Sequence, residues 1–296
     1  MALARRLGGE VVSADASQLY RGMDVGTAKL TPRERQGVPH HQLDVLDVTD
    51  EASVAAYQRH ARADVGAIAS RGAVPVVVGG SGLYVRAVLD RLEIPPTDPG
   101  VRQRLEQRAA REGTAALLED LRRVDPRAAA SIEPNNTRRL VRALEVVELT
   151  GRPFSATMPR REYLRPSLAI GLRADREDLD RRIEQRAARM FDTGLVDETR
   201  TLVTQGLRDG RTASRAVGYA QALAVLDGTM TTADAVADTA LRTRRLVRRQ
   251  ESWFGADPRV QWLDALAPDL LDRALGLVEA ASAVIARRGW DDAAHG

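Results

Sequence analysis

The sequence predicts an α/β protein in which a parallel sheet is interrupted by an all-helical insertion. Residues 10–15 form a short strand that ends on a carboxylate. Residues 74–78 are an apolar, β-branched run without polar alternation, which is typical of a parallel strand buried on both faces. An amphipathic helix is expected between them at residues 54–70, whereas residues 101–150 carry helical patterns only. This order indicates a βαβ core that binds ligands at the carboxyl ends of its strands.

The remaining elements complete this architecture. Within the insertion, helices are expected to stop near Gly113, Asp125 and Asn135, and Asn136 or Thr137 is expected to cap the last helix. The elements expected after the insertion are a strand at 168–172, a charged helix at 175–192 and a last strand at 260–263. The predicted domains are a first core part at 1–97, the helical insertion at 98–166, and a second core part at 167–296 with C-terminal helices. The tail, residues 291–296, is predicted to be disordered.

Composition excludes several classes of protein. The 296 residues include no cysteine, so disulfides, thiolate zinc sites and cysteine nucleophiles are excluded. No apolar run reaches the ~18 residues of a membrane span. The N-terminus lacks the apolar segment of a secretory signal, so a cytoplasmic protein is expected. His40 and His41 point to opposite sides of an extended segment, and no metal site is predicted from side chains alone.

The cations are almost all arginine. The formal net charge is +3 and the pI is near 9.6, which is compatible with a polyanionic partner. Lys29 is the only lysine. The arginines reflect either a compositional bias or a use of arginine for bidentate phosphate contacts. Their positions in the fold must decide between these explanations.

Two polar positions follow the two expected strands. Asp15 lies at a strand end, where a carboxylate faces the ligand crevice and can take a proton from an amine or bind a metal; a helix cap or loop aspartate is equally compatible with that position. The turn at residues 79–82 (GGSG) lets backbone approach an anion, with the Ser81 hydroxyl near a helix N-terminus. Many α/β proteins use such a turn only to reverse the chain.

Arginines concentrate at three further places. Arg138, Arg139 and Arg142 open a helix and share a face, which suits either phosphate binding or a solvated surface. The segment 242–249, which includes Arg244, is the densest basic stretch, and a pyrophosphate or a nucleic-acid backbone would match its charge. A Walker A loop needs Gly-Lys followed by Ser or Thr. Because Lys29 is followed by leucine, these 296 residues contain no such loop.

Six segments together resemble the bacterial tRNA dimethylallyltransferases, the IPP transferase family, over nearly the whole chain. The segments are SADASQLYRGMDVGTAK (13–29), VPHHQLDV (38–45), PVVVGGSGLY (75–84), NNTRRLVRALEV (135–146), AVGYAQAL (216–223) and TRRLVRRQESWF (243–254). Their shared order and spacing make the resemblance far more specific than any one segment.

The resemblance implies a P-loop NTPase-like core and a helical insertion that grips the anticodon stem. It implies transfer of a dimethylallyl group from dimethylallyl pyrophosphate to the N6 amine of the adenosine 3′-adjacent to the anticodon. Asp15 would accept the proton of that amine, and Ser81 would contact the leaving pyrophosphate, as would Arg186 and, by its charge, Arg244. The residues expected to contact tRNA are Asp15, Ala16, Ser17, Gln18, Arg102, Arg138, Arg139, Leu140, Val141, Arg142, Arg215, Gly218 and Tyr219. Mg²⁺ and nucleotide binding are implied, and a monomer is expected.

Two departures from the family's pattern stand out. Ala16 replaces a serine, which costs at most one hydrogen bond. The family's first strand, its P-loop and half of its first helix would precede Met1, so a misassigned start codon or a truncated sequence is expected. The alternative is a tRNA-binding homologue that transfers little because the P-loop is missing. A relative that alkylates free adenine nucleotides is disfavoured, because a free nucleotide needs no helical insertion.

Overall fold

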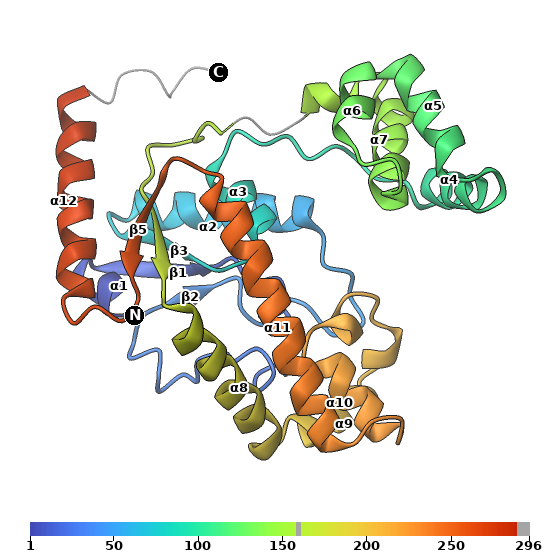
Figure 1. Cartoon of the computed structure of the whole chain (residues 1–296). Coiled ribbons are helices and arrows are strands. Elements are labelled where there is room, and N and C mark those ends of the chain that lie inside the picture. The colour runs from blue at the N-terminus through green and yellow to red at the C-terminus, as the bar shows by residue number, and fades with distance from the viewer. Residues whose placement is uncertain (158–160, 289–296) are drawn as a thin grey trace. The chain divides into compact units, whose positions relative to one another are not determined.

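The computed structural model describes residues 1–157 and 161–288, which form two compact units (Figure 1). The core unit comprises Met1–Leu89 and the chain from Arg165 onward, and the helical unit is Asp90–Leu164. The contacts therefore divide the chain after Leu89 and before Arg165, whereas the predicted boundaries lie after residues 97 and 166. The tail predicted to be disordered lies outside the described residues. In the described part of the chain, none of the helices has the length and apolarity to cross a membrane.

Parallel strands form two small sheets in the core unit. The strands are β1 (Gly9–Ser13), β2 (His40–His41), β3 (Val74–Val78), β4 (Ala169–Arg173) and β5 (Val260–Asp264). The first sheet has the order β2-β1-β3 with Val11 opposite Val76, and the second pairs β4 with β5. The predicted α/β fold with a parallel sheet is thus confirmed.

The predicted burial of residues 74–78 on both faces is wrong at the ends of the strand. Val74 and Val78 are 39% and 50% exposed, because β3 is an edge strand among the described residues and pairs with β1 alone. Apolar, β-branched composition correctly indicated a strand, but it did not show where that strand lies in the sheet.

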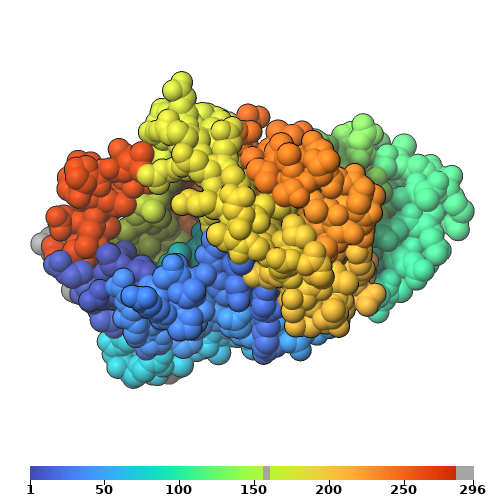
Figure 2. Space-filling model, turned by 90° about the horizontal axis from the view of Figure 1, so that it is seen from below, coloured from blue at the N-terminus to red at the C-terminus, as the bar shows by residue number. Residues whose placement is uncertain are grey.

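Helices surround the sheets of the core unit. They are α1 (Ala2–Arg6), α2 (Val54–Ser70), α3 (Gly82–Leu89), α8 (Arg176–Asp192), α9 (Leu195–Thr204), α10 (Tyr219–Leu226), α11 (Thr232–Gly255) and α12 (Leu270–Arg288), with single 3₁₀ turns at Leu207–Asp209 and Ala213–Arg215. Ser53 caps α2 by accepting a hydrogen bond from the Ala56 amide, and Asp175 caps α8 similarly. Figure 2 shows one surface hollowed between the blue N-terminal segments and the yellow segment that includes α8.

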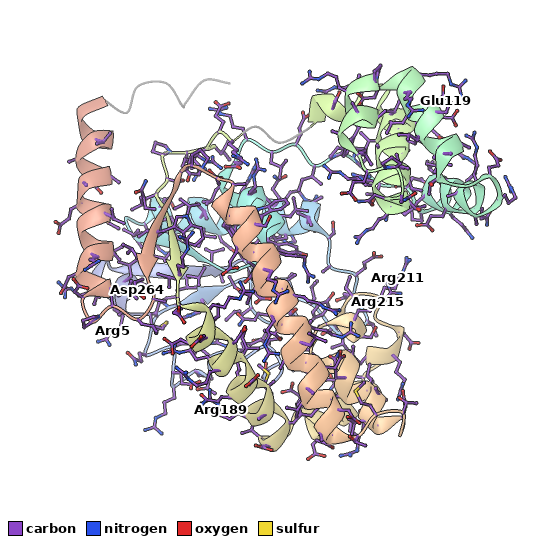
Figure 3. The ribbon with its side chains drawn as sticks, viewed as in Figure 1. Arg5, Glu119, Arg189, Arg211, Arg215 and Asp264 are labelled. Carbon is purple, nitrogen blue, oxygen red and sulfur yellow. The ribbon has the colours of Figure 1, made fainter. Side chains whose placement is uncertain are left out.

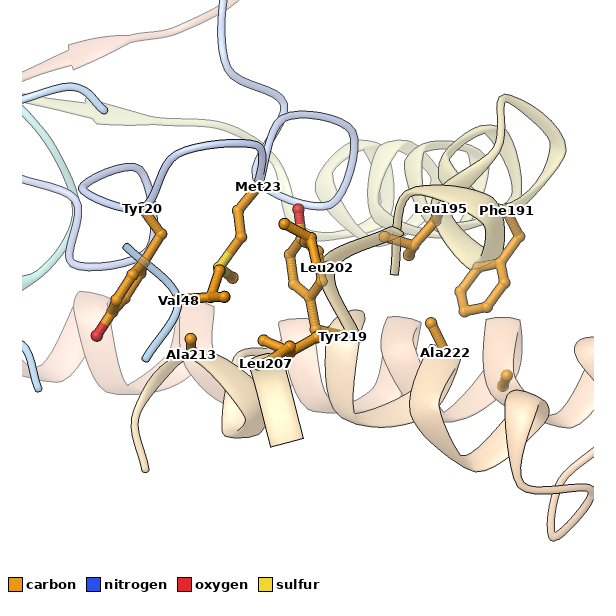
Figure 4. Packing of buried hydrophobic residues seen from close by; sticks show 11 residues of the cluster. Tyr20, Met23, Val48, Phe191, Leu195, Leu202, Leu207, Ala213, Tyr219 and Ala222 are labelled. Carbon is orange, nitrogen blue, oxygen red and sulfur yellow. The ribbon is translucent and has the colours of Figure 1, made fainter. Parts of the chain in front are cut away.

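The largest apolar cluster joins the loop after β1 to the C-terminal helices (Figure 4). Tyr20 and Met23 of that loop pack with Leu195 and Leu202 of α9 and with Tyr219 of α10, and all five are at most 2% exposed. Burial of such side chains contributes roughly 1.5–3 kcal/mol each. Segments almost two hundred residues apart therefore hold one another at the carboxyl side of the sheet.

The helical unit has its own core. Its elements are α4 (Pro99–Glu112), α5 (Thr114–Val124), α6 (Pro126–Ser131), α7 (Thr137–Thr150) and a 3₁₀ turn at Phe154–Thr157. The three predicted stops are confirmed: Gly113 separates α4 from α5, Asp125 caps α6, and Asn136 caps α7 by accepting from the Arg139 amide at 3.2 Å. Leu117, Leu121 and Leu140 are fully buried between these helices.

One ion cluster predicts an acid-sensitive contribution to stability. Glu10 of β1 accepts hydrogen bonds from Arg71 at 2.5 Å and from His41 at 2.7 Å, and these bonds lower its pKa from 4.5 to about 2. Because the folded pKa is below the unfolded value, the stabilisation is fully present above pH 4.5 and is lost as pH falls towards 2. We expect the difference in urea midpoint between wild type and Glu10→Gln to be constant from pH 5.5 to 7 and to shrink steadily from pH 4.5 to 3. A difference that stayed constant down to pH 3 would contradict this assignment.

Candidate active site

The carboxyl ends of β1 and β3 bring Asp15 and Ser81 into one place. The Ala14 amide donates to the Val78 carbonyl at 2.7 Å, which holds the two strand ends together. One residue beyond Asp15, the Ala16 amide donates to the Ser81 hydroxyl oxygen at 3.3 Å. The two strand-end positions predicted from the sequence therefore share one edge of the sheet.

Asp15 keeps one carboxylate oxygen available. Its Oδ1 accepts from the Ser17 amide at 2.8 Å, which forms a tight turn. Its own amide lies 3.4 Å from the Ser13 hydroxyl oxygen. In the described part of the chain, Oδ2 has no hydrogen-bond partner, and the residue is half-buried. Asp15 is thus a turn aspartate and also a carboxylate that can accept a hydrogen bond from a ligand.

The glycine turn lets neighbouring atoms approach its backbone closely, and at Gly79 the neighbour is itself backbone. A Cβ on Gly79 would lie 2.4 Å from the Ala14 carbonyl, and a Cβ on Gly80 would lie 2.1 Å from Nε2 of Gln250. Gln250 Nε2 donates to the Gly80 carbonyl at 3.0 Å. The end of α11 therefore forms a further wall of the site.

Gln250 and Trp253 were not predicted as site residues. Trp253 is 45% exposed, and its indole packs against Gly82. A Cβ on Gly82 would lie only 2.3 Å from Nε1 of Trp253. The signal was present, since a spacing of three places both residues on one face of a helix. Residues 242–249 are rich in arginine, so this segment was interpreted as a basic surface and not as a wall of the site.

The residues predicted for the Arg215 segment separate into exposed and buried ones. Arg215 is exposed at the end of its 3₁₀ turn and projects from the core unit beside Arg211 (Figure 3). Gly218 and Tyr219 are buried, and the Tyr219 hydroxyl donates to Glu198 at 2.5 Å. Burial, with the nearby Glu198 carboxylate, raises the pKa of Tyr219 and keeps the phenol a donor. In this conformation only Arg215 offers tRNA a side chain.

The two arginines predicted to bind pyrophosphate differ in whether they form ion pairs. Arg244 of α11 pairs with Glu184 and, at 3.5 Å, with Asp180 of α8, so its charge is already neutralised. Arg186 is exposed on α8 and forms no ion pair with any residue that the structure describes. A role for Arg244 on a diphosphate would require its two ion pairs to open.

In the helical unit, buried Glu145 holds two of the predicted arginines. Arg102 lies 3.0 Å and Arg142 lies 2.7 Å from Glu145 Oε2. Burial alone would raise the pKa of Glu145, but the hydrogen bonds from Arg142, Arg102 and the Asp98 amide hold it below its usual value. Arg142 also donates to the carbonyls of Pro95 and Pro96. Arg102 and Arg142 therefore have a structural role, because they connect α4, α7 and the segment before α4.

The other predicted residues of α7 divide by burial. Leu140 and Val141 are buried in the core of the helical unit, so any contact they make with tRNA must come from backbone atoms. Arg138 and Arg139 are exposed, and neither forms an ion pair within the described part of the chain. The first turn of α7 therefore presents two free positive charges.

The strand edge suits Mg²⁺ only together with a phosphate ligand. Among the described residues there is no group of three or more His, Asp or Glu side chains able to hold a metal. One carboxylate and one hydroxyl, Asp15 and Ser81, lie at the edge. Mg²⁺ is commonly bound by one or two protein oxygens together with substrate phosphates and water.

Known proteins of one family match the chain along most of its length. The family model described as "IPP transferase" matches residues 18–257. The tRNA dimethylallyltransferases of Kocuria rhizophila and Thermobifida fusca are each 58% identical to it, over 92% and 91% of this chain and 86% and 84% of theirs. The structure of tRNA isopentenylpyrophosphate transferase from Bacillus halodurans has a TM-score of 0.67 and 38% identity, covering 95% of this chain and 92% of that one. A eukaryotic dimethylallyltransferase that acts on tRNA shares the fold, with a TM-score of 0.78 and 22% identity, over 99% of this chain and 77% of its own.

Proposed function

This chain belongs to the IPP transferase family, and we propose that it transfers the dimethylallyl group of dimethylallyl pyrophosphate to the N6 amine of the adenosine 3′-adjacent to the anticodon of a tRNA. The observation that carries the proposal is the position of Asp15, with a free carboxylate oxygen, beside the glycine turn that carries Ser81. A proton acceptor and an anion-binding turn are the two functions that such a transfer needs.

The transfer exchanges one bond for another. The allylic carbon–oxygen bond of the donor breaks, a bond forms between that carbon and N6, and the pyrophosphate leaves with the bonding pair. The amine loses a proton, which Asp15 Oδ2 accepts. Because an aromatic amine is a weak nucleophile, a carboxylate that orients it and takes its proton contributes to the rate.

The Ser81 side chain is suited to the leaving group. Its oxygen accepts from the Ala16 amide, so its hydroxyl proton is available to donate to a phosphate oxygen. The turn precedes α3, whose N-terminal amides favour an anion. Arg186 is a second candidate for the pyrophosphate, and Mg²⁺, if bound, would neutralise part of its charge.

Exposed arginines suit the phosphates of the tRNA acceptor. Arg138, Arg139 and Arg215 carry free guanidinium groups, which can bind phosphate oxygens in a bidentate manner. The adenosine must leave its stack to reach a protein site, and backbone contacts elsewhere hold the RNA during that step. We therefore propose that the protein grips its tRNA acceptor through these arginines, and the expectations of a cytoplasmic location and a monomeric state are kept as part of the proposal.

The salt dependence of tRNA binding tests this role. The slope of log K against log salt is negative, and replacing Arg138 and Arg139 by glutamine should reduce its magnitude by about 1–2, because binding releases fewer counterions when phosphate contacts are lost. Arg122→Gln with Arg123→Gln is the matched control, since these neighbours on α5 are exposed but pair with Glu119 and Asp120. An equal change in both double variants would assign the effect to net charge rather than to contacts.

Transfer itself is tested with unmodified tRNA and labelled dimethylallyl pyrophosphate. We expect label on tRNA and none on free adenosine monophosphate. A free nucleotide lacks the RNA backbone phosphates that the arginines of the helical unit are proposed to bind, so it would not be held at the site. The chain should be assayed alone and, where in-frame coding sequence lies upstream of Met1, also extended by it. Binding of tRNA without transfer in every form assayed would favour the second candidate, a tRNA-binding homologue without activity.

A further inference from the structure

Glu198 of α9 binds the loop that follows β1. Its carboxylate accepts hydrogen bonds from three successive backbone amides, those of Asp24 at 3.2 Å, Val25 at 2.8 Å and Gly26 at 3.5 Å. It also accepts from the Tyr219 hydroxyl at 2.5 Å. Successive amides that converge on one carboxylate form an anion-binding concavity. Here the anion is the Glu198 carboxylate of the protein itself. Its hydrogen bonds to the three amides therefore hold the loop against α9.

The Tyr219 ring fixes the same loop from a second side. A Cβ on Gly26 would lie 2.5 Å from the ring, so the loop backbone passes directly against it. Met23, at the start of the loop, is fully buried in the cluster that contains Tyr219. The loop is therefore held by packing and by the bonds to Glu198 together.

From this loop, hydrogen bonds lead to the residue proposed to take the proton. The Thr27 carbonyl accepts from Gln18 Nε2 at 3.2 Å. The Oε1 atom of Gln18 accepts from the Ser13 hydroxyl at 3.3 Å, and that hydroxyl oxygen lies 3.4 Å from the Asp15 amide. Gln18 thus connects the loop to the two residues on either side of Ala14.

We propose that Glu198 is a positioning residue for the transfer: it holds residues 24–27 in place and, through Gln18, sets the orientation of the Asp15 carboxylate. The inference rests on the proposed function. Glu198 shares no hydrogen bond with Asp15 or Ser81 among the described residues, and α9, which carries it, packs on the loop through Leu195 and Leu202. Its effect on the reaction must therefore pass through the loop.

The inference predicts a loss of rate without a loss of binding. Glu198→Gln should lower kcat by about 10- to 100-fold, because a displacement of about 1 Å at a reacting group costs up to that factor. The KM for dimethylallyl pyrophosphate and the Kd for tRNA should stay within about twofold, since Glu198 contacts neither in this account. Rates should be expressed per tRNA-binding molecule, so that misfolded protein does not lower kcat.

Asp197→Asn is the matched control, because Asp197 is exposed on the same helix and, within the described part of the chain, forms an ion pair with Arg200 alone. Tyr219→Phe removes a single hydroxyl from the cluster and keeps the ring against Gly26, so it stays usable if Glu198→Gln folds poorly. The two variants combined should lower kcat no further than Glu198→Gln alone, because they break one network. Amide hydrogen exchange across residues 20–29 should accelerate in both single variants and not in Asp197→Asn.

The outcomes separate this inference from the proposed function. If the wild-type protein is active and both Glu198→Gln and Tyr219→Phe keep its kcat, the positioning role is overturned. A rise in the KM for the donor without a fall in kcat would overturn it as well. An inactive wild-type protein would instead contradict the proposed function. In that case unchanged exchange across residues 20–29 would still overturn the claim that Glu198 holds the loop.

Discussion

Replacing Asp15 by asparagine is expected to lower kcat for prenyl transfer by about 10²–10⁴-fold, the usual contribution of a general base. Asparagine keeps the side-chain oxygen that accepts from the Ser17 amide, so the turn should survive. It loses the negative charge and the proton affinity of Oδ2. The affinity for tRNA should change by less than about twofold. Contacts to the RNA backbone position the tRNA, and replacing one carboxylate by a neutral amide removes none of them.

Asp264 provides the matched control for this substitution. It ends β5 as Asp15 follows β1, and its Oδ1 likewise accepts from the amide two residues on, Leu266, at 2.8 Å. Asp264→Asn therefore makes the same chemical change in the same kind of turn, on the other sheet (Figure 3). Normal transfer in Asp15→Asn, or equal losses in both variants, would show that Asp15 is not the base.

Replacing Glu145 by glutamine is expected to destabilise the helical unit by about 1.5–3 kcal/mol, the value of hydrogen bonds to a charged group, because the two guanidinium groups left behind are 38% and 24% exposed and stay partly solvated. Glu145 is fully buried and joins Arg102, Arg142 and the Asp98 amide. Glutamine would leave two guanidinium groups without a counter-charge. The entry of the chain into α4 and the start of α7 should loosen together.

The two units allow the effect to be located. The helical unit contains no tryptophan, whereas Trp253 and Trp262 belong to the core unit, so fluorescence of these two residues should show an unchanged unfolding midpoint. Hydrogen exchange in peptides from residues 98–150 should accelerate. Glu148→Gln, one turn along α7, is the control, because its exposed pair with Arg104 is worth at most about 1 kcal/mol. Equal acceleration in the two variants would refute the special role of the buried carboxylate.

Local signals in the sequence predicted much of the fold. Asp125 and Asn136 cap helices through side-chain bonds to amides three residues on, and Gly113 adopts a φ of +81° between two helices. Such features depend on neighbouring residues, so they can be read without knowledge of the tertiary structure. The predicted strand ends at residues 15 and 78 also indicated where the candidate site lies.

The roles of charged residues could not be predicted in the same way, because a side chain's partner is set by tertiary contacts. Lys29, the only lysine, is buried with its ammonium 2.7 Å from Asp24 and 2.6 Å from Asp44. Arg244 stands in the densest basic segment and yet is paired. Sequence spacing indicated positive charge in both places, but it could not show that the charge is already neutralised within the fold.

The most direct test of the account is the position of the transferred group. A tRNA transcript should be incubated with the protein and labelled dimethylallyl pyrophosphate, digested to nucleosides, and analysed by mass spectrometry. We expect one labelled nucleoside, an adenosine carrying the dimethylallyl group on N6, from the position 3′-adjacent to the anticodon, and a strongly reduced amount of it with Asp15→Asn. Label at another position, on another atom, or undiminished in Asp15→Asn would contradict it.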